Sequence, residues 1–144
     1  MPKEKGLDRL FVEDRVSEVF RNLTQTSTKN ASILTQPFKE NKDTFLWAVS
    51  LGVKFGSRKP LEDKREGLLR WDYLSNDEKQ CLGMLALAET GDINVLKDEG
   101  TIQEIAEEYA NQGIRILKQY VYDGAGDPLW KLVNLVRTEE NKQN

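Results

Sequence analysis

Six basic side chains lie close together in the chain, and such groups are the ones that bind phosphate. Between residues 54 and 70 the sequence has six Lys or Arg and only three Asp or Glu. The basic residues are Lys54, Arg58, Lys59, Lys64, Arg65 and Arg70. Side chains of this kind contact the backbone of nucleic acids, with an affinity that falls steeply as salt is added. The segment is therefore a candidate nucleic-acid-binding site, and a solvated loop after a buried helix is the alternative.

A second set of candidate residues is acidic and lies in the later half of the chain. Its members are Glu89, Asp92, Asp98, Glu99, Glu104, Glu107 and Glu108. Carboxylates that converge could hold Mg²⁺ for a nuclease or phosphotransfer reaction, or they could face a basic partner. Their spacing lacks the regular ligand positions of a calcium-binding loop. We favour the interpretation that these residues form a solvated helix face.

The sequence excludes several kinds of catalysis, because it has no histidine and only one cysteine, Cys81. Ser-His-Asp and Cys-His arrangements require a histidine, as does histidine acid–base catalysis. One thiol without histidine leaves no ligand set for an ordinary zinc site. Cys81 lies in the apolar row of an expected helix, so we expect it to be buried as a small hydrophobic residue. We predict no catalytic residues, no metal site and no cofactor, and a protein that is not an enzyme.

Length and composition are typical of one soluble domain. The chain has 144 residues, of which 38% are hydrophobic and 31% are charged. No apolar run approaches the roughly 20 residues of a membrane-spanning helix, and the N-terminus has no signal-peptide pattern. We therefore expect no membrane contact and a cytoplasmic location. The net charge of −3 restricts any nucleic-acid site to a local basic patch.

Apolar residues recur at helical spacing along most of the chain and nowhere alternate for long with the period of a strand. Helices are expected over residues 13–23, 41–55, 76–90, 101–122 and 128–137. The predicted fold is all-α or nearly all-α, a single compact domain of five to six helices around a central apolar helix. We expect a flexible N-terminal arm over 1–11, the helical domain over 12–137 and a flexible tail over 138–144.

The expected central helix spans residues 41–55 and is apolar on most sides. Gly52 within it costs about 1 kcal/mol relative to Ala, and close approach of another helix would compensate for that cost. Gly56 follows the last turn, where a residue in the left-handed conformation commonly ends a helix. The sequence thus predicts a close helix neighbour at Gly52 and a left-handed cap at Gly56.

Three segments together resemble a known protein family. They read PFKENKDTFLWAVSLGVKFGSRKPL, LALAETGDINVLKD and EIAEEYANQGIRILKQYV, and they extend over roughly residues 37–122. In the order of these features the chain is similar to the DNA phosphorothioation (dnd) system-associated protein 4 family. The resemblance implies a bacterial or archaeal protein that acts beside DNA-modification or phage-restriction machinery in an accessory role. It supplies no catalytic residues.

These observations lead to a primary functional hypothesis and two alternatives. The primary one is a non-enzymatic accessory protein of a DNA sulphur modification, restriction and antiviral defence system, which binds DNA or another protein of that system. One alternative is a carboxylate–metal nuclease or phosphotransfer enzyme. The other is a purely structural homo-oligomer, and the oligomeric state is left open.

Overall fold

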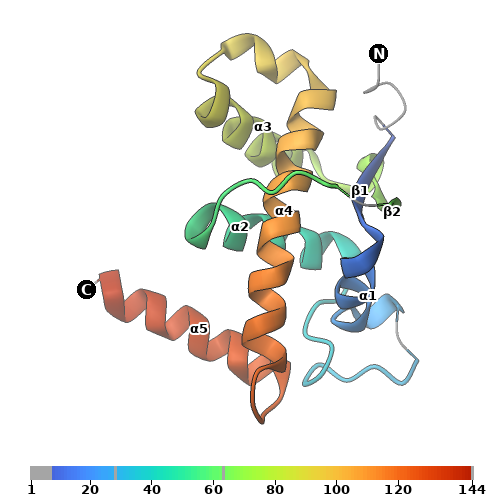
Figure 1. Cartoon of the computed structure of the whole chain (residues 1–144), viewed down its shortest axis with the longest axis vertical. Helices are drawn as coiled ribbons and strands as arrows, with labels where there is room; N and C mark the ends of the chain where they lie inside the picture. The colour runs from blue at the N-terminus through green and yellow to red at the C-terminus, as the bar shows by residue number, and fades with distance from the viewer. Residues whose placement is uncertain (1–7, 28, 63, 144) are drawn as a thin grey trace.

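One long helix, α4 (Glu99–Tyr122), runs through the middle of the molecule, and most other elements pack against it (Figure 1). The computed structural model describes residues 8–27, 29–62 and 64–143. Within these residues α4 contacts four other helices and one strand. The other α-helices are α1 (Asp14–Asn22), α2 (Asn41–Phe55), α3 (Asn76–Thr90) and α5 (Pro128–Gln143). Short 3₁₀ turns are η2 (Gln25–Ser27), η3 (Trp71–Tyr73) and η4 (Ile93–Lys97). The prediction of a mainly helical fold is confirmed.

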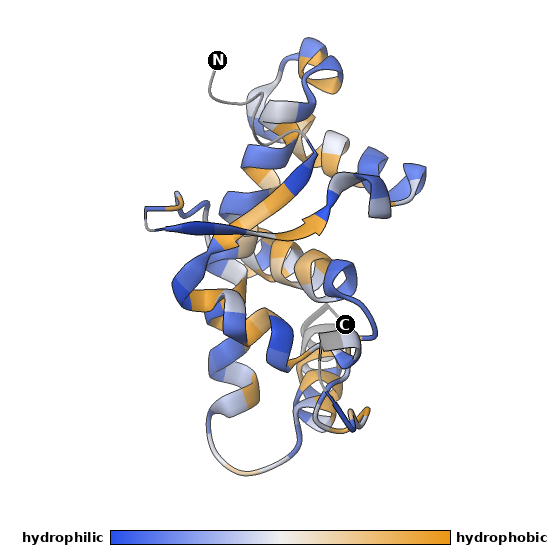
Figure 2. Ribbon diagram, turned by 90° about the vertical axis from the view of Figure 1, so that its right-hand side faces the viewer, coloured by the Kyte–Doolittle hydropathy of each residue, from blue (hydrophilic) through white to orange (hydrophobic). Residues whose placement is uncertain are grey.

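A small antiparallel sheet shows that the fold is mostly rather than entirely α-helical. Strand β1 (Arg9–Glu13) pairs with β2 (Arg65–Arg70), and in each strand hydrophobic residues are flanked by hydrophilic ones (Figure 2). In β1, Leu10 is fully buried and Val12 is 3% exposed. Both contribute to the core beside α4, and this burial stabilises a strand that has too few residues to show a clear period.

Strand β1 and helix α5 extend into the two end segments for which the sequence predicts an arm and a tail. Residues 9–11 belong to β1, although the sequence pattern places them in a flexible arm. Residues 1–7 of that arm lie outside the described residues. At the other end, α5 continues to Gln143, past residue 137 where the helical domain is expected to end, and residue 144 lies outside the described residues.

Helices α2 and α4 touch backbone to backbone, as Gly52 predicts. A Cβ atom added at Gly52 would overlap the carbonyl group of Tyr109, with the carbonyl carbon only 2.9 Å away. On the opposite helix, a Cβ added at Gly113 would overlap the carbonyl oxygen of Ala48 and lie 2.9 Å from the backbone nitrogen of Gly52. Two glycines, one on each helix, therefore allow an approach that no side chain would permit.

The prediction that α2 is the central apolar helix is not confirmed. Val53 and Phe55 of α2 are 45% and 39% exposed, so solvent reaches the last turn of that helix, and α4 occupies the centre instead. Gly56 does end α2, but its φ of −140° is not left-handed. Its small size matters because a Cβ there would lie 2.7 Å from Cγ of Gln112.

Helix α3 follows its sequence signals closely at both ends. Ser75 accepts a hydrogen bond from the backbone of Glu78 at 3.1 Å, and Gly91 ends the helix with a left-handed φ of 68°. Cys81, in contrast, is exposed, and the prediction that it is buried is wrong. The face of α3 that packs on the core carries Leu82 and Ala86 instead. Among the described residues, no helix combines the length and apolar character needed to cross a membrane.

The close contact between α2 and α4 gives a first prediction. Gly113→Ala should lower the free energy of unfolding by about 3 kcal/mol, because the new methyl group meets rigid backbone. Gly83→Ala in α3 is the matched control. Its added Cβ would meet only side-chain ends, Leu96 Cδ2 at 3.3 Å and Ile102 Cδ1 at 3.9 Å. This control should be neutral or stabilising by up to about 1 kcal/mol, and urea unfolding of both variants measures the difference.

Candidate nucleic-acid interface

The structure separates the six predicted basic residues into two groups. Lys54, Arg58 and Lys59 lie at the end of α2 and in the segment that follows it. Lys64, Arg65 and Arg70 lie just before strand β2 and within it. In Figure 1 the segment between the groups crosses α4 from the end of α2 to the sheet. The two groups therefore occupy different parts of the molecule and have different surroundings.

Arg58, in the first group, is engaged by two carboxylates of the protein itself. Its Nε donates to Oε1 of Glu108 at 2.9 Å, and its Nη1 donates to Oε1 of Glu89 at 3.4 Å. Partial burial lowers the pKa of Arg58, but these two carboxylates outweigh that effect and raise the pKa above its usual value. The guanidinium of Arg58 therefore links the first group to helices α3 and α4. Because it is already paired, it is less available to bind a phosphate.

The predicted acidic residues serve mainly as hydrogen-bond acceptors and helix caps. Glu107 is 4% exposed and accepts from the backbone nitrogen of Phe11 at 2.8 Å, which ties α4 to β1. Glu99 accepts from the indole Nε1 of Trp71 at 2.9 Å. Asp92 and Asp98 cap η4 and α4. Across the described residues, no three His, Cys, Asp or Glu side chains gather closely enough to form a candidate metal site.

The second group meets an additional arginine, Arg9, that the sequence pattern does not single out. In the antiparallel register Arg9 lies directly opposite Arg70. The side chain of Arg9 extends over Gly67, where an added Cβ would lie 2.9 Å from Arg9 Cδ. We call the four residues Arg9, Lys64, Arg65 and Arg70 the basic ribbon; all are exposed. The sequence pattern misses Arg9 because the register that places it beside β2 connects segments more than fifty residues apart.

Within the part of the chain that the structure describes, the contacts of the basic ribbon neutralise its charge only weakly. Arg70 forms an ion pair with Asp72 at 3.4 Å, but the two side chains are 52% and 71% exposed, and such pairs contribute little. Arg65 donates from Nη2 to the carbonyl oxygen of Leu61 at 3.2 Å, a contact that leaves its charge intact. Glu66 on the same strand pairs with Arg21 of α1. The ribbon therefore presents positive charge to solvent.

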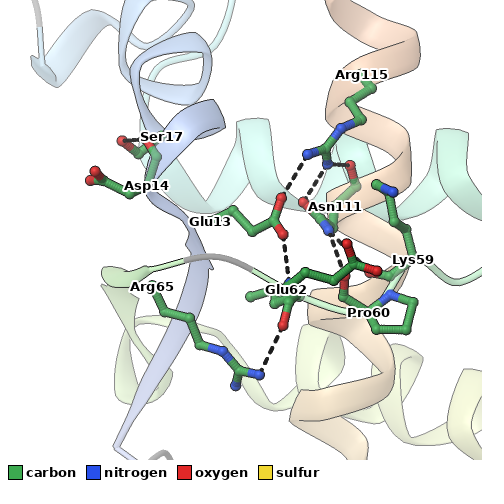
Figure 3. A network of polar contacts seen from close by, with 10 residues as sticks. Glu13, Asp14, Ser17, Lys59, Pro60, Glu62, Arg65, Asn111 and Arg115 are labelled. Atoms are coloured by element: carbon green, nitrogen blue, oxygen red, sulfur yellow. Dashed lines mark hydrogen bonds and ion pairs between the residues drawn. The ribbon is translucent and has the colours of Figure 1, made fainter.

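A buried polar network holds the segment that leads into the basic ribbon (Figure 3). Glu13 at the end of β1 is 2% exposed, and its Oε1 accepts from Nη2 of Arg115 at 2.6 Å. Its Oε2 accepts from the backbone nitrogen of Glu62 at 2.7 Å. Asn111, one turn before Arg115 on α4, donates from Nδ2 to the carbonyl oxygens of Lys59 and Pro60 at 3.1 and 3.3 Å. The network thus joins β1, α4 and the segment from 59 to 62.

The network also determines the protonation of Glu13. Burial alone would raise the pKa of this carboxyl group, but the hydrogen bonds from Arg115 and from the backbone of Glu62 outweigh it. The pKa of Glu13 is therefore below its usual value, and the side chain is a carboxylate at neutral pH. A second bond fixes the guanidinium, because Nη1 of Arg115 donates to Oδ1 of Asn111 at 2.5 Å.

Comparison with known proteins identifies the family. The family model for DNA sulphur modification system-associated protein 4 matches residues 10–144. The chain belongs to this family. The match confirms the resemblance seen over roughly residues 37–122 and extends it to α5 and to residues 10–13 of β1, so that Arg9 is the one residue of the basic ribbon outside it. No curated protein and no solved structure matches the chain.

The buried network gives a second prediction. Arg115→Ala leaves Glu13 buried without its main partner and should lower the free energy of unfolding by on the order of 3 kcal/mol. Arg21→Ala is the matched control, because it also removes an arginine that pairs with a glutamate, Glu66, but at a more exposed position. The control should cost under about 1 kcal/mol. Urea unfolding measures both losses. Equal losses in the two variants would show that the buried network contributes no more to stability than the more exposed Arg21–Glu66 pair.

The pKa of Glu13 gives a third prediction, on the pH dependence of stability. A carboxyl group whose pKa is lowered in the folded state stabilises the protein above its ordinary pKa, and this contribution is lost as the pH falls. Stability should therefore decline as the pH falls below about 4.5, the usual value. Glu13→Gln should be less stable at pH 7 and should decline less steeply over the same range. Parallel curves for the two proteins would contradict the assignment.

Proposed function

We propose that this protein is a non-enzymatic accessory component of a bacterial DNA sulphur modification system and that it binds the phosphate backbone of duplex DNA through the basic ribbon. Membership of the family supports the link to the modification system. The position of Arg9 directly opposite Arg70 supports the DNA contact. The proposed site of action is the cytoplasm, where the DNA is.

The Arg9–Arg70 pair carries this proposal because the repulsion between its two charges opposes folding. Like charges directly opposite each other in an antiparallel sheet are destabilising, whereas opposite charges stabilise the pair. Asp72 offsets the repulsion only through an exposed ion pair. An arrangement that costs stability is expected where the charges serve to bind an anion.

The dimensions of the ribbon suit a phosphate backbone. Arg65 and Arg70 lie five residues apart on β2, which corresponds to about 17 Å along a strand. Duplex DNA carries one negative charge for about every 1.7 Å of its axis, so a surface of this length meets several phosphates. Contacts of this kind bind without reading the sequence, and they weaken as salt is added.

The enzymatic alternative has less support from the geometry. Its candidate groups were the acidic residues, and most of them already accept hydrogen bonds, cap helices or pair with Arg58. Carboxylates used in this way are not directed at one point where a metal ion could be held. We therefore propose a binding role rather than a catalytic one.

The decisive experiment is a salt titration of binding to a short duplex DNA, followed by fluorescence anisotropy. The double variant Arg9→Gln, Arg70→Gln should bind more weakly, and the slope of log affinity against log salt should fall by about 2. The control is Lys54→Gln, Lys59→Gln, which removes the same charge from the first basic group and should leave the slope nearly unchanged. Absence of binding at low salt, or equal effects of the two double variants, would contradict the proposal.

A single substitution separates the binding role of the ribbon from its structural role. Arg70→Glu replaces the repulsion from Arg9 by an attraction but loses the exposed ion pair with Asp72, so the free energy of unfolding should change by less than about 1 kcal/mol. The same variant should lose DNA affinity, because it reverses a charge that faces phosphate. Thermal unfolding and anisotropy of the same sample check both outcomes. A variant that binds DNA as well as the wild type would overturn the assignment of Arg70.

A further inference from the structure

An open cavity of about 440 Å³ lies between helix α3, the 3₁₀ turn η4 and the first turn of α4. Its apolar lining consists of Trp71, Gly83, Met84, Leu96 and Ile102. Met84 and Leu96 are 58% and 41% exposed, which are large fractions for apolar side chains. A cavity of this size with a mainly apolar wall is typical of a site for a small organic group.

Polar side chains also line the cavity, and they include hydrogen-bond donors as well as acceptors. Asn76 and Gln80 lie one turn apart on α3, and each has an amide that can both donate and accept. Lys79 supplies an ammonium group, whose Nζ lies 5.5 Å from the centre of the Trp71 ring. Glu99 supplies a carboxylate that accepts from the Trp71 indole at 2.9 Å and so holds the ring in place.

This combination of groups restricts the chemistry of a ligand. The Glu99 carboxylate would repel a phosphate or another simple anion, and an aliphatic group would leave the polar side chains of the cavity without partners. A nucleobase satisfies both conditions, because it is a flat ring with donors and acceptors along its edge. The amides of asparagine and glutamine are the usual partners of adenine, to which they donate one hydrogen bond and from which they accept another.

The cavity begins at the end of the basic ribbon where Arg9 and Arg70 lie. Trp71 directly follows Arg70, and its backbone N–H donates to the carbonyl oxygen of Asp8, the residue before Arg9, at 2.9 Å. In DNA a single sugar separates each phosphate from its base. A strand whose phosphates lie on Arg9 and Arg70 therefore has a base within reach of the cavity when that base is turned out of the duplex.

We propose that this cavity binds one nucleobase, turned out of a DNA duplex that lies on the basic ribbon. The inference rests on the proposed DNA contact of the ribbon and adds to it a preference for DNA with an unpaired base. Turning a base out of a duplex costs pairing and stacking energy, and this cost is lowest for a base that has no partner. The ribbon then supplies affinity for any duplex, and the cavity selects the duplexes in which a base is unpaired.

Fluorescence anisotropy with two duplexes tests the proposal. They are identical except that one strand of the second duplex contains an additional, unpaired adenine. The wild type should bind the second duplex about tenfold more tightly, as expected for hydrogen bonds to the edge of a base. In the variant Asn76→Ala, Gln80→Ala this preference should disappear, whereas the affinity for the fully paired duplex and its salt dependence should be unchanged. Equal binding of the two duplexes by the wild type would overturn the proposal and leave the phosphate contact of the ribbon intact.

The matched control is the variant Gln119→Ala, Asn134→Ala. It removes the same two types of side chain from exposed positions on α4 and α5 that lie outside the cavity. The control should keep the preference for the unpaired adenine, and circular dichroism confirms that both double variants are folded. Loss of the preference in the control as well would contradict the assignment to the cavity.

Free adenosine tests the cavity independently of the ribbon. At millimolar concentration it should shift the amide NMR signals of Gly83 and Leu96, and ribose, which has no base, should not. The variant Arg9→Gln, Arg70→Gln should respond to adenosine like the wild type, although it binds DNA more weakly. Absence of these shifts would overturn the proposal, whereas binding of the paired duplex in the same sample would show that the proposed function still holds.

Discussion

The buried ion pair between Glu13 and Arg115 is the interaction on which the arrangement of the candidate site depends. A carboxylate that is almost fully removed from water is tolerated only when its partners replace the lost solvation, and here a guanidinium and a backbone N–H do so. The three groups belong to β1, α4 and the segment that enters β2. Because Glu13 binds both of the others, the segment from 59 to 62 is held against β1 and α4.

The scaffold behind this site is the contact between α2 and α4. Gly52 and Gly113 bring the two backbones together, and this leaves α4 in contact with elements on several sides. The charged surface is thus built on a packed interior, because the strands that carry Arg9, Arg65 and Arg70 also contribute Leu10, Val12, Leu68 and Leu69 to the core.

Local signals in the sequence predict local features well. Ser75 and Gly91 mark the ends of α3, Pro128 begins α5, and Gly52 indicates a close helix neighbour. The features that the sequence does not predict depend on contacts between distant segments. Strands β1 and β2 are short, and their register is set by pairing across more than fifty residues, so neither the sheet nor the Arg9–Arg70 pair is visible in the sequence. Arg58 pairs with Glu89 and Glu108, and Cys81 is exposed. Both features likewise depend on the relative orientation of packed helices, which the sequence pattern does not give.

The most direct test of the central claim is to map the DNA contact residue by residue by NMR. Addition of a short duplex DNA at low salt to ¹⁵N-labelled protein should shift the amide signals of residues 9–12 and 64–70, and these shifts should disappear as salt is added. Signals from the end of α2, where Lys54 lies, should move little. Shifts confined to α2 or α5, or no shifts at low salt, would contradict the account.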